Sequence, residues 1–433
     1  MSIGRSAWLV AMVGVQAAWF CVRSLFAGEP FDASIGWILA ATLVSGALVA
    51  ATPIACGLGG AIASLASRPR LALLAVALLG FAAGAISSEL QPAPSLDEGF
   101  VLDAARSMAR GGLDGLVAAY RQNEWLARRH PPLGPTLFGA GVAAGLDLHG
   151  LRLLSAALLG LTAALTTRIA QSLYGSPTDV RAGVAVATLP LLVRMGGLAM
   201  NELLLTAVAT AAVLVALSLS RSAAPDRPGR DGVALGAAIG VAVLIKYTMS
   251  LLAPAAIGIA LVHRRLINRR RSLAVACGIA GLVFAAWWFA LRAIGAADAQ
   301  IDWLTRYSLA GLGSSFGPWS AGEAIAAKLP SAIGLYHLPL LLVGLRAAWG
   351  KGFAGAGTLL VWIATISLPL LLTLPENRYF LPAFPAIAIL LALGLDRLPD
   401  WRDDALLLAL LLSLVTVAYY GSLEVRTPAR FPW

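Results

Sequence analysis

Long, continuous apolar runs separated by short polar links dominate the sequence. The first three runs cover about residues 7–27, 35–62 and 71–90, and each is comparable to the roughly 20 residues that cross a bilayer as a helix. Further apolar runs cover about residues 133–146, 151–174, 182–193, 203–219, 233–245, 249–262, 273–291, 332–345, 352–374, 379–395 and 405–420. Because these runs do not alternate between apolar and polar residues, they are not typical of a transmembrane β-barrel. The pattern predicts an all-α polytopic membrane protein.

Composition supports this class and excludes two others. Hydrophobic residues make up 59% of the 433 residues and charged residues 12%, whereas a soluble domain has about 25% charged residues. A water-soluble enzyme and a disordered chain are therefore excluded. The net charge of +10 comes from basic residues in short links, which follows the positive-inside rule and predicts no nucleic-acid partner. The three cysteines lie inside apolar runs, so neither a disulfide framework nor a metal-ligand spacing is visible.

The charges of the links predict the topology. The basic links 67–70, 221–231 and 263–271 (HRRLINRRR) are predicted inside, with the N-terminus, and the acidic link 28–32 outside. Residues 133–146 are short and begin in Pro-rich sequence, so we expect them not to cross fully. About 13 crossings then remain, at roughly 20 residues for each crossing.

We expect five regions along the chain. An external loop is expected to carry two short interfacial helices, broken at Gly111–Gly112. The regions are 1–90 with the N-terminal helices, 91–132 with this loop, 133–292 with the core helices, 293–330 with a second external loop, and 331–433 with the C-terminal helices.

The acidic pair Asp97–Glu98 directly follows the third apolar run and is the first candidate for chemistry. Ionisable residues beside a membrane span are costly unless they are paired or functional. A carboxylate in such a place can act as the general base for an acceptor hydroxyl or amine. The alternative interpretation is a helix N-cap, since acids favour that end of a helix.

Three further features interrupt apolar sequence. His130 begins the sequence HPPLGP, whose two adjacent prolines prevent a regular helix, so His130 either holds a phosphate or sugar hydroxyl or simply precedes a helix. Arg194 and Asn201–Glu202 need polar partners or form a turn between two spans. Lys246 is isolated among apolar residues; it pairs with Asp97 or Glu202, binds a phosphate, or extends to the headgroups.

Two candidates lie later in the chain. Arg378 and Tyr379 begin a late apolar run, where arginine offers a fork suited to phosphate oxygens or a plain juxtamembrane anchor. Arg306 lies in the second external loop with Trp303, Tyr307 and Trp319. Aromatic residues there are typical of the membrane interface, and they also suit stacking on a sugar.

Six segments, in the same order, resemble the multi-spanning GT-C glycosyltransferases, especially the branch of protein O-mannosyltransferases and lipid A aminoarabinose transferases. They span about residues 90–390 and comprise Asp97–Glu98, His130-Pro-Pro-Leu-Gly, the helix start with Arg152, Arg194 to Leu204, Gly240 to Lys246, and Arg378-Tyr-Phe-Leu-Pro-Ala-Phe-Pro. Where the family usually has an aspartate after the Arg194-like arginine, this chain has Asn201 or Glu202, and we favour Glu202.

The resemblance implies a GT-C fold and sugar transfer from a polyprenyl-phosphate-linked donor to an unknown glycan, lipid or protein acceptor. The reaction would be inverting, on the outer face of the plasma membrane, with no cofactor and typically no metal. Asp97 would be the base, supported by Glu98 and Glu202. The donor phosphate and substrate would be bound by His130, Arg152, Arg194, Lys246, Arg306, Arg378 and Tyr379.

Two other classes of protein share the same hydropathy. A transporter or lipid flippase would use Asp97 and Lys246 as an intramembrane relay and would leave the sugar–phosphate bond intact. A non-catalytic membrane scaffold would tolerate the loss of Asp97. The long interfacial loop and the absence of a visible internal repeat favour the glycosyltransferase over the transporter.

Overall fold

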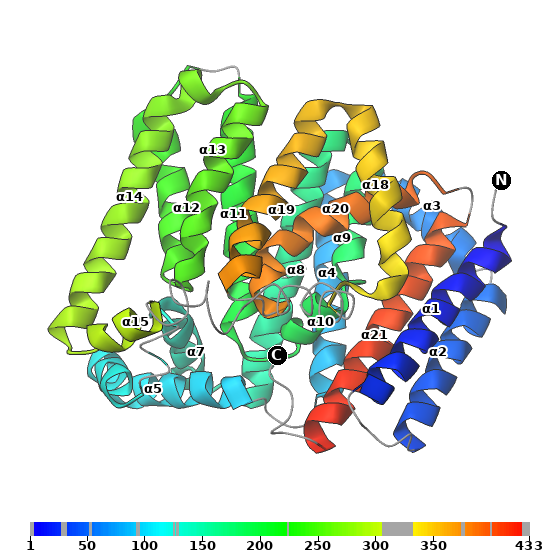
Figure 1. The fold of residues 1–433 in the computed structure, drawn as a ribbon, viewed down its shortest axis with the longest axis horizontal. Coiled ribbons are helices and arrows are strands. Elements are labelled where there is room, and N and C mark those ends of the chain that lie inside the picture. The colour runs from blue at the N-terminus through cyan, green and yellow to red at the C-terminus, as the bar shows by residue number, and fades with distance from the viewer. Residues whose placement is uncertain are drawn as a thin grey trace.

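The structure is a computed structural model, and it describes residues 4–26, 33–51, 54–91, 96–123, 126, 130–222, 225–304, 332–373, 377–398 and 401–426. Over these residues, every regular element is a helix (Figure 1). In chain order the elements are α1 (Arg5–Phe26), α2 (Ala33–Ala51), α3 (Ile54–Ala66), α4 (Pro69–Glu89), α5 (Leu96–Gln122), α7 (Leu133–Ala143), α8 (Leu148–Tyr174), α9 (Thr178–Val186), α10 (Pro190–Gly196), α11 (Asn201–Arg221), η1 (Pro228–Gly232), α12 (Val233–Val243), η2 (Tyr247–Leu251), α13 (Leu252–Val262), α14 (Leu266–Ala293), α15 (Ala297–Leu304), η5 (Leu335–His337), α18 (Leu338–Lys351), α19 (Phe353–Thr373), η6 (Asn377–Ala383), α20 (Phe384–Leu395) and α21 (Arg402–Arg426).

The predicted class, an all-helical multi-pass membrane protein, is confirmed. Eight helices in the described part of the chain are long and apolar enough to cross a membrane. These candidate spans are Arg5–Val22, Pro69–Glu89, Leu148–Tyr174, Asn201–Arg221, Leu266–Ala293, Phe353–Leu371, Asn377–Leu395 and Arg402–Tyr420. The total of about 13 crossings, counted at roughly 20 residues each, stays a prediction.

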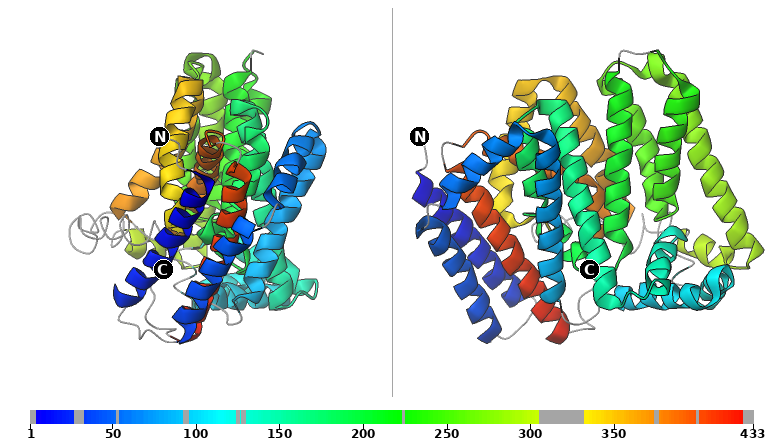
Figure 2. Two further views of the ribbon diagram at one scale, coloured as in Figure 1. Left: turned by 90° about the vertical axis from the view of Figure 1, so that its right-hand side faces the viewer. Right: turned by 180° about the vertical axis from the view of Figure 1, so that it is seen from behind.

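The N-terminal helices α1 and α2 pack beside α21 at one side of the bundle (Figures 1 and 2). Nε2 of Gln16 donates to Oγ1 of Thr416 over 3.0 Å, and the rings of Phe20 and Tyr419 have centroids 4.9 Å apart. A hydrogen bond between buried side chains is favourable where no water competes for it. The N-terminal helices are therefore an integral part of the bundle.

Three apolar runs that read as continuous in the sequence are interrupted in the structure. The run at 182–193 forms two short helices, α9 and α10, because Pro190 begins the second one and cannot continue the first. Between the two helices, the carbonyl of Thr188 accepts a hydrogen bond from Oη of Tyr336 over 3.2 Å. The run at 379–395 begins with the 3₁₀ helix η6, and the run at 35–62 is divided between α2 and α3.

The basic link at 263–271 is also different from the expectation. Helix α14 begins at Leu266, so Arg269, Arg270 and Arg271 lie on a helix rather than in a loop. The break expected at Lys246 is confirmed: Lys246 has an extended backbone between α12 and η2.

Helix α5 lies across one end of the bundle (Figure 1 and the right-hand view of Figure 2), beside α7 and α15. Its helical course breaks at Gly112, which has φ 57° and ψ −135°, so the predicted pair of short helices is confirmed. An L-residue with a side chain rarely adopts this conformation. Helix α7 begins directly after Pro131 and Pro132. It is too short to be among the eight candidate spans.

Helices α4 and α8 approach each other closely at the centre of the bundle. A Cβ atom on Gly160 would lie 2.4 Å from the carbonyl oxygen of Ala77, and one on Gly80 would lie 2.9 Å from Cα of Gly160. Small residues are typical of such contacts between membrane helices.

We predict that Gly160→Ala lowers the free energy of unfolding by about 1–3 kcal/mol, because the new methyl group must displace the α4 backbone. Thermal unfolding in detergent measures the effect. The control is Gly281→Ala on α14, where a Cβ meets nothing within 4 Å; that change should be neutral or slightly stabilising, because alanine favours the helix. Equal melting temperatures for the two variants would contradict the close approach.

Candidate functional site

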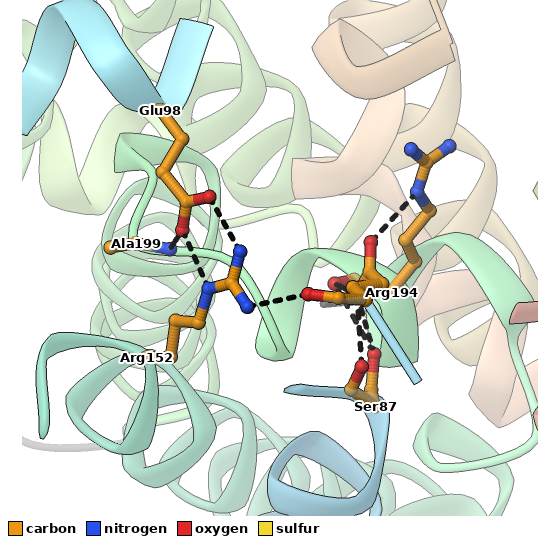
Figure 3. A network of polar contacts seen from close by, with 6 residues as sticks. Ser87, Glu98, Arg152, Arg194 and Ala199 are labelled. Atoms are coloured by element: carbon orange, nitrogen blue, oxygen red, sulfur yellow. Dashed lines mark hydrogen bonds and ion pairs between the residues drawn. The ribbon is translucent and has the colours of Figure 1, made fainter. Parts of the chain in front are cut away.

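A buried network at the α5 end of the bundle is centred on Glu98 (Figure 3). Glu98 is fully buried, and its Oε1 and Oε2 accept hydrogen bonds from Nε and Nη2 of Arg152 over 3.0 and 2.8 Å. Oε1 also accepts from the backbone N–H of Ala199 over 2.7 Å. This two-point pairing is the strong geometry for arginine and a carboxylate. Glu98 thus ties α5 to α8 and to the segment before α11.

Gln91 extends this network to Arg194. Its backbone oxygen accepts from Nη1 of Arg152 over 2.6 Å, and its Oε1 accepts from Nε of Arg194 over 3.2 Å. The guanidinium of Arg194 also lies 5.5 Å from the ring centroid of Tyr420. Sequence reasoning missed Gln91, although it is the first amide side chain after the apolar run of α4. Arg152 and Arg194 are therefore both engaged by protein groups.

A second buried group is centred on Lys246. Its Nζ donates to Oε1 of Glu202 over 3.0 Å and lies 4.0 Å from the ring centroid of Tyr379. The sequence leaves Asp97 and Glu202 open as partners for Lys246, and in the structure Lys246 pairs with Glu202. Within the described residues, Oε2 of Glu202 accepts no hydrogen bond although it is buried. A buried ion pair with an unused oxygen retains capacity to bind a further donor.

His130 lies between these elements, in the segment that links α5 to α7. The amide of Asn201 donates to Nδ1 of His130 over 3.0 Å, and Oη of Tyr120 donates to the His130 carbonyl over 2.5 Å. Burial, and secondarily the nearby Tyr247, raise the pKa of Tyr120 well above its ordinary value, so Tyr120 remains a donor at physiological pH. The N–H of Leu133 donates to the carbonyl of Leu244 over 3.0 Å, which holds the HPPLG segment beside the Lys246 break.

The short helix η6 contributes Arg378 and Tyr379, both buried. Nε1 of Trp362 on α19 donates to the carbonyl of Pro382 over 2.9 Å and holds this helix in place. The guanidinium of Arg378 lies 5.5 Å from the ring centroid of Tyr379. Helix η6 therefore adds a second cation to the elements that surround Lys246.

An apolar cavity of about 300 Å³ lies beside the same helix. Phe380, Ala383 and Phe384 form one side of it, and Ile363 and Leu368 of α19 form part of the other. Ser367 is the one polar residue among those that line it. The cavity therefore suits a hydrocarbon chain, and the residues of η6 connect it to Arg378 and Tyr379.

Two of the predicted site residues are incompletely described. Asp97 is the second residue of α5, directly before the anchored Glu98, and its side chain lies outside the described part of the chain. Arg306 lies outside the described residues altogether, as do Tyr307 and Trp319. Among the residues that are described, no three His, Cys, Asp or Glu side chains gather in a way that could hold a metal ion.

Comparison with known proteins gives one family and one fold. Residues 129–313 match the sequence model of the family described as dolichyl-phosphate-mannose-protein mannosyltransferase. None of the curated proteins matches the chain in sequence.

Among solved structures, ArnT from Cupriavidus metallidurans bound to undecaprenyl phosphate aligns with 82% of this chain and 77% of its own, at 17% identity and a TM-score of 0.58. ArnT from the same organism in the apo state aligns with 76% of this chain and 59% of its own, at 19% identity and a TM-score of 0.55. The archaeal oligosaccharyltransferase AglB from Archaeoglobus fulgidus aligns with 81% of this chain and 56% of its own, at 14% identity and a TM-score of 0.48.

The fold and the family match together define the class: a membrane-embedded glycosyltransferase of the GT-C type that uses a lipid-linked sugar. The match of residues 129–313 to the dolichyl-phosphate-mannose-protein mannosyltransferase family confirms the resemblance found in the sequence motifs. The match includes His130, Arg152, Arg194, Glu202 and Lys246. It supports neither the transporter nor the scaffold alternative.

We predict that Arg152→Met lowers the free energy of unfolding by about 3–5 kcal/mol, because it leaves Glu98 buried without its cation. The double variant Glu98→Gln with Arg152→Met should recover part of this loss, since no unpaired charge remains. Chemical unfolding in detergent measures both. Additive losses in the double variant would contradict the coupling.

Proposed function

We propose that the protein transfers a sugar from a polyprenyl-phosphate donor to an acceptor on the outer face of the plasma membrane. The observation that carries this proposal is the buried group of Lys246, Glu202 and Tyr379, beside His130. Lys246, Glu202 and His130 lie within the part of the chain that matches the family. ArnT, which has the same fold, is described with undecaprenyl phosphate bound. The lipid phosphate would bind at Lys246 and Arg378.

The apolar cavity beside η6 would receive part of the polyprenyl chain. Arg378 and Tyr379 begin the helix whose next residue, Phe380, lines this cavity. An anionic head at Lys246 and a hydrocarbon chain at Phe380 would therefore belong to one amphiphilic molecule. A soluble nucleotide sugar has no hydrocarbon chain that could fill the apolar cavity.

The reaction we infer is a single inverting displacement. Asp97 takes the proton of the acceptor hydroxyl or amine, whose oxygen or nitrogen attacks the anomeric carbon of the sugar. The bond from that carbon to the phosphate oxygen breaks, and the electron pair leaves with the polyprenyl phosphate. Lys246 and Arg378 stabilise the charge that develops on this leaving phosphate.

The hydrogen bonds of Glu98 support Asp97, rather than Glu98, as the base. Both oxygens of Glu98 already accept strong hydrogen bonds from Arg152 and Ala199. These donors occupy the oxygens of Glu98 and leave less room for the proton of an acceptor. Glu98 would instead be a positioning residue, since it anchors the first turn of α5, which carries Asp97.

The orientation follows from the two ends of the bundle. Arg264 and Arg265 lie between α13 and α14, and Arg270 and Arg271 lie near the start of α14, at the end opposite α5 (Figure 1). By the positive-inside rule that end would face the cytoplasm, which would place Asp97 and Lys246 on the outer side. We also propose the five regions and the count of about 13 crossings, at roughly 20 residues each, for the same arrangement.

We predict that Asp97→Asn lowers sugar transfer by at least about 100-fold, the usual contribution of a general base. The variant should still insert into the membrane and retain donor lipid in native mass spectrometry. The control is Asp103→Asn, an exposed acid on the same helix, which should keep its activity. Wild-type turnover in the Asp97 variant would eliminate this residue as the base.

We further predict that the double variant Lys246→Met with Glu202→Gln binds undecaprenyl phosphate at least about tenfold more weakly than the wild type, which corresponds to about 1.4 kcal/mol. Removing both charges avoids an unpaired Glu202. The matched control is Lys351→Met, because Lys351 also lies over a tyrosine ring, 5.7 Å from Tyr174, at the other end of the bundle. Unchanged affinity in the double variant would exclude Lys246 from the phosphate site.

A further inference from the structure

Helix α14 is longer than the hydrocarbon core of a bilayer. Its 28 residues extend over about 42 Å, whereas the hydrocarbon core is about 30 Å thick. Three of its four charged residues, Arg269, Arg270 and Arg271, are in its first two turns, and the fourth, Arg292, is in its last turn. The first two turns therefore continue the helix beyond the apolar span, at the end of the bundle opposite α5 (Figure 1).

The neighbouring helix η1 is held firmly against this part of α14. Arg269 is buried, and its Nη2 and Nη1 donate to the carbonyls of Ser222 and Pro225 over 2.8 and 3.3 Å. It also forms ion pairs with Asp226 and Asp231 at 4.0 and 3.9 Å. Arg269 therefore joins residues 222–231 to the first turns of α14, and the two segments form one surface.

The remaining arginines of this surface are not neutralised. Arg227 and Arg230 belong to the η1 side, and Arg264, Arg270 and Arg271 to the α14 side; all five are exposed. Within the described part of the chain, none of the five forms an ion pair with an acid. Five exposed cations thus lie on the two segments that the buried, paired Arg269 joins.

An apolar side chain lies among these cations. Ile267 is 77% exposed, and Arg270 and Arg271 are three and four residues further along the same helix. Residues at these spacings share one face of a helix. Exposed isoleucine beside arginine is typical of a surface that contacts the boundary between headgroups and acyl chains.

We propose that this α14 basic surface (Arg227, Arg230, Arg264, Arg270, Arg271 and Ile267) binds the phosphate of anionic phospholipid headgroups. Arginine binds phosphate oxygens through two parallel N–H donors, and several arginines beside a membrane span attract anionic lipids. The exposed Ile267 and the attachment to a membrane helix favour a lipid over a soluble polyanion. The inference goes beyond sugar transfer and uses none of the residues proposed for it.

The test is a titration of the purified full-length protein in neutral detergent with dioleoyl phosphatidylglycerol and, separately, dioleoyl phosphatidylcholine, read by native mass spectrometry. We expect phosphatidylglycerol to bind at least about tenfold more tightly, and the difference to shrink in high salt, where the Debye length falls to about 3 Å. Arg270→Gln with Arg271→Gln should remove about tenfold or more of this preference. Ile267→Gln should weaken both lipids while the salt dependence remains.

The matched control is Arg68→Gln with Arg70→Gln, which removes two exposed arginines, one directly before α4 and one in its first turn. It should leave the preference for phosphatidylglycerol intact. An equal loss in the control variant would overturn the proposal, because any basic link would then serve. So would equal binding of the two phospholipids, or tight binding of polyglutamate with no preference for phosphatidylglycerol. Sugar transfer is measured separately, so its failure would not affect this outcome.

Discussion

The geometry of the α5 end depends on the buried ion pair between Glu98 and Arg152. In surroundings without water, either charge alone would be strongly destabilising, so the two must stay together. The pair also holds the N–H of Ala199, and this bond fixes the segment between α10 and α11. Two residues of α11 then follow directly: Asn201 contacts His130, and Glu202 contacts Lys246. One pairing thus positions two groups that are far apart in the sequence.

The two buried glutamates differ in how many of their oxygens accept hydrogen bonds. Glu98 has three donors on its two oxygens, whereas Glu202 has Lys246 on one oxygen and, among the described residues, nothing on the other. A fixed group of this kind can stabilise developing charge without reorganising, because folding has already oriented it. The more rigid acid therefore suits positioning, and the less saturated pair suits an incoming phosphate.

Much of this arrangement was predictable from local sequence. The apolar runs indicated the helices, Gly112 indicated the break in α5, and isolated Lys246 indicated an interrupted span, because each is a property of a few neighbouring residues. The break before Pro190 was missed although the proline itself marks it. The helical start at Leu266 was missed because contacts between residues distant in sequence, such as Arg269 with Ser222, stabilise it. Partners such as Arg152 for Glu98 and Gln91 for Arg194 were beyond sequence reasoning, because residues more than fifty positions apart meet there.

The arginines illustrate why the type of a residue does not by itself reveal what it does. Arg152 and Arg269 are both buried, both donate to backbone carbonyls and both form ion pairs with carboxylates, so each stabilises the fold. Arg270 and Arg271 adjoin Arg269 in sequence, yet they are exposed on the helix surface. The helical twist produces this difference, because consecutive side chains point about 100° apart. A run of three arginines that looks uniform in the sequence therefore contains one structural residue and two that are free to meet a ligand.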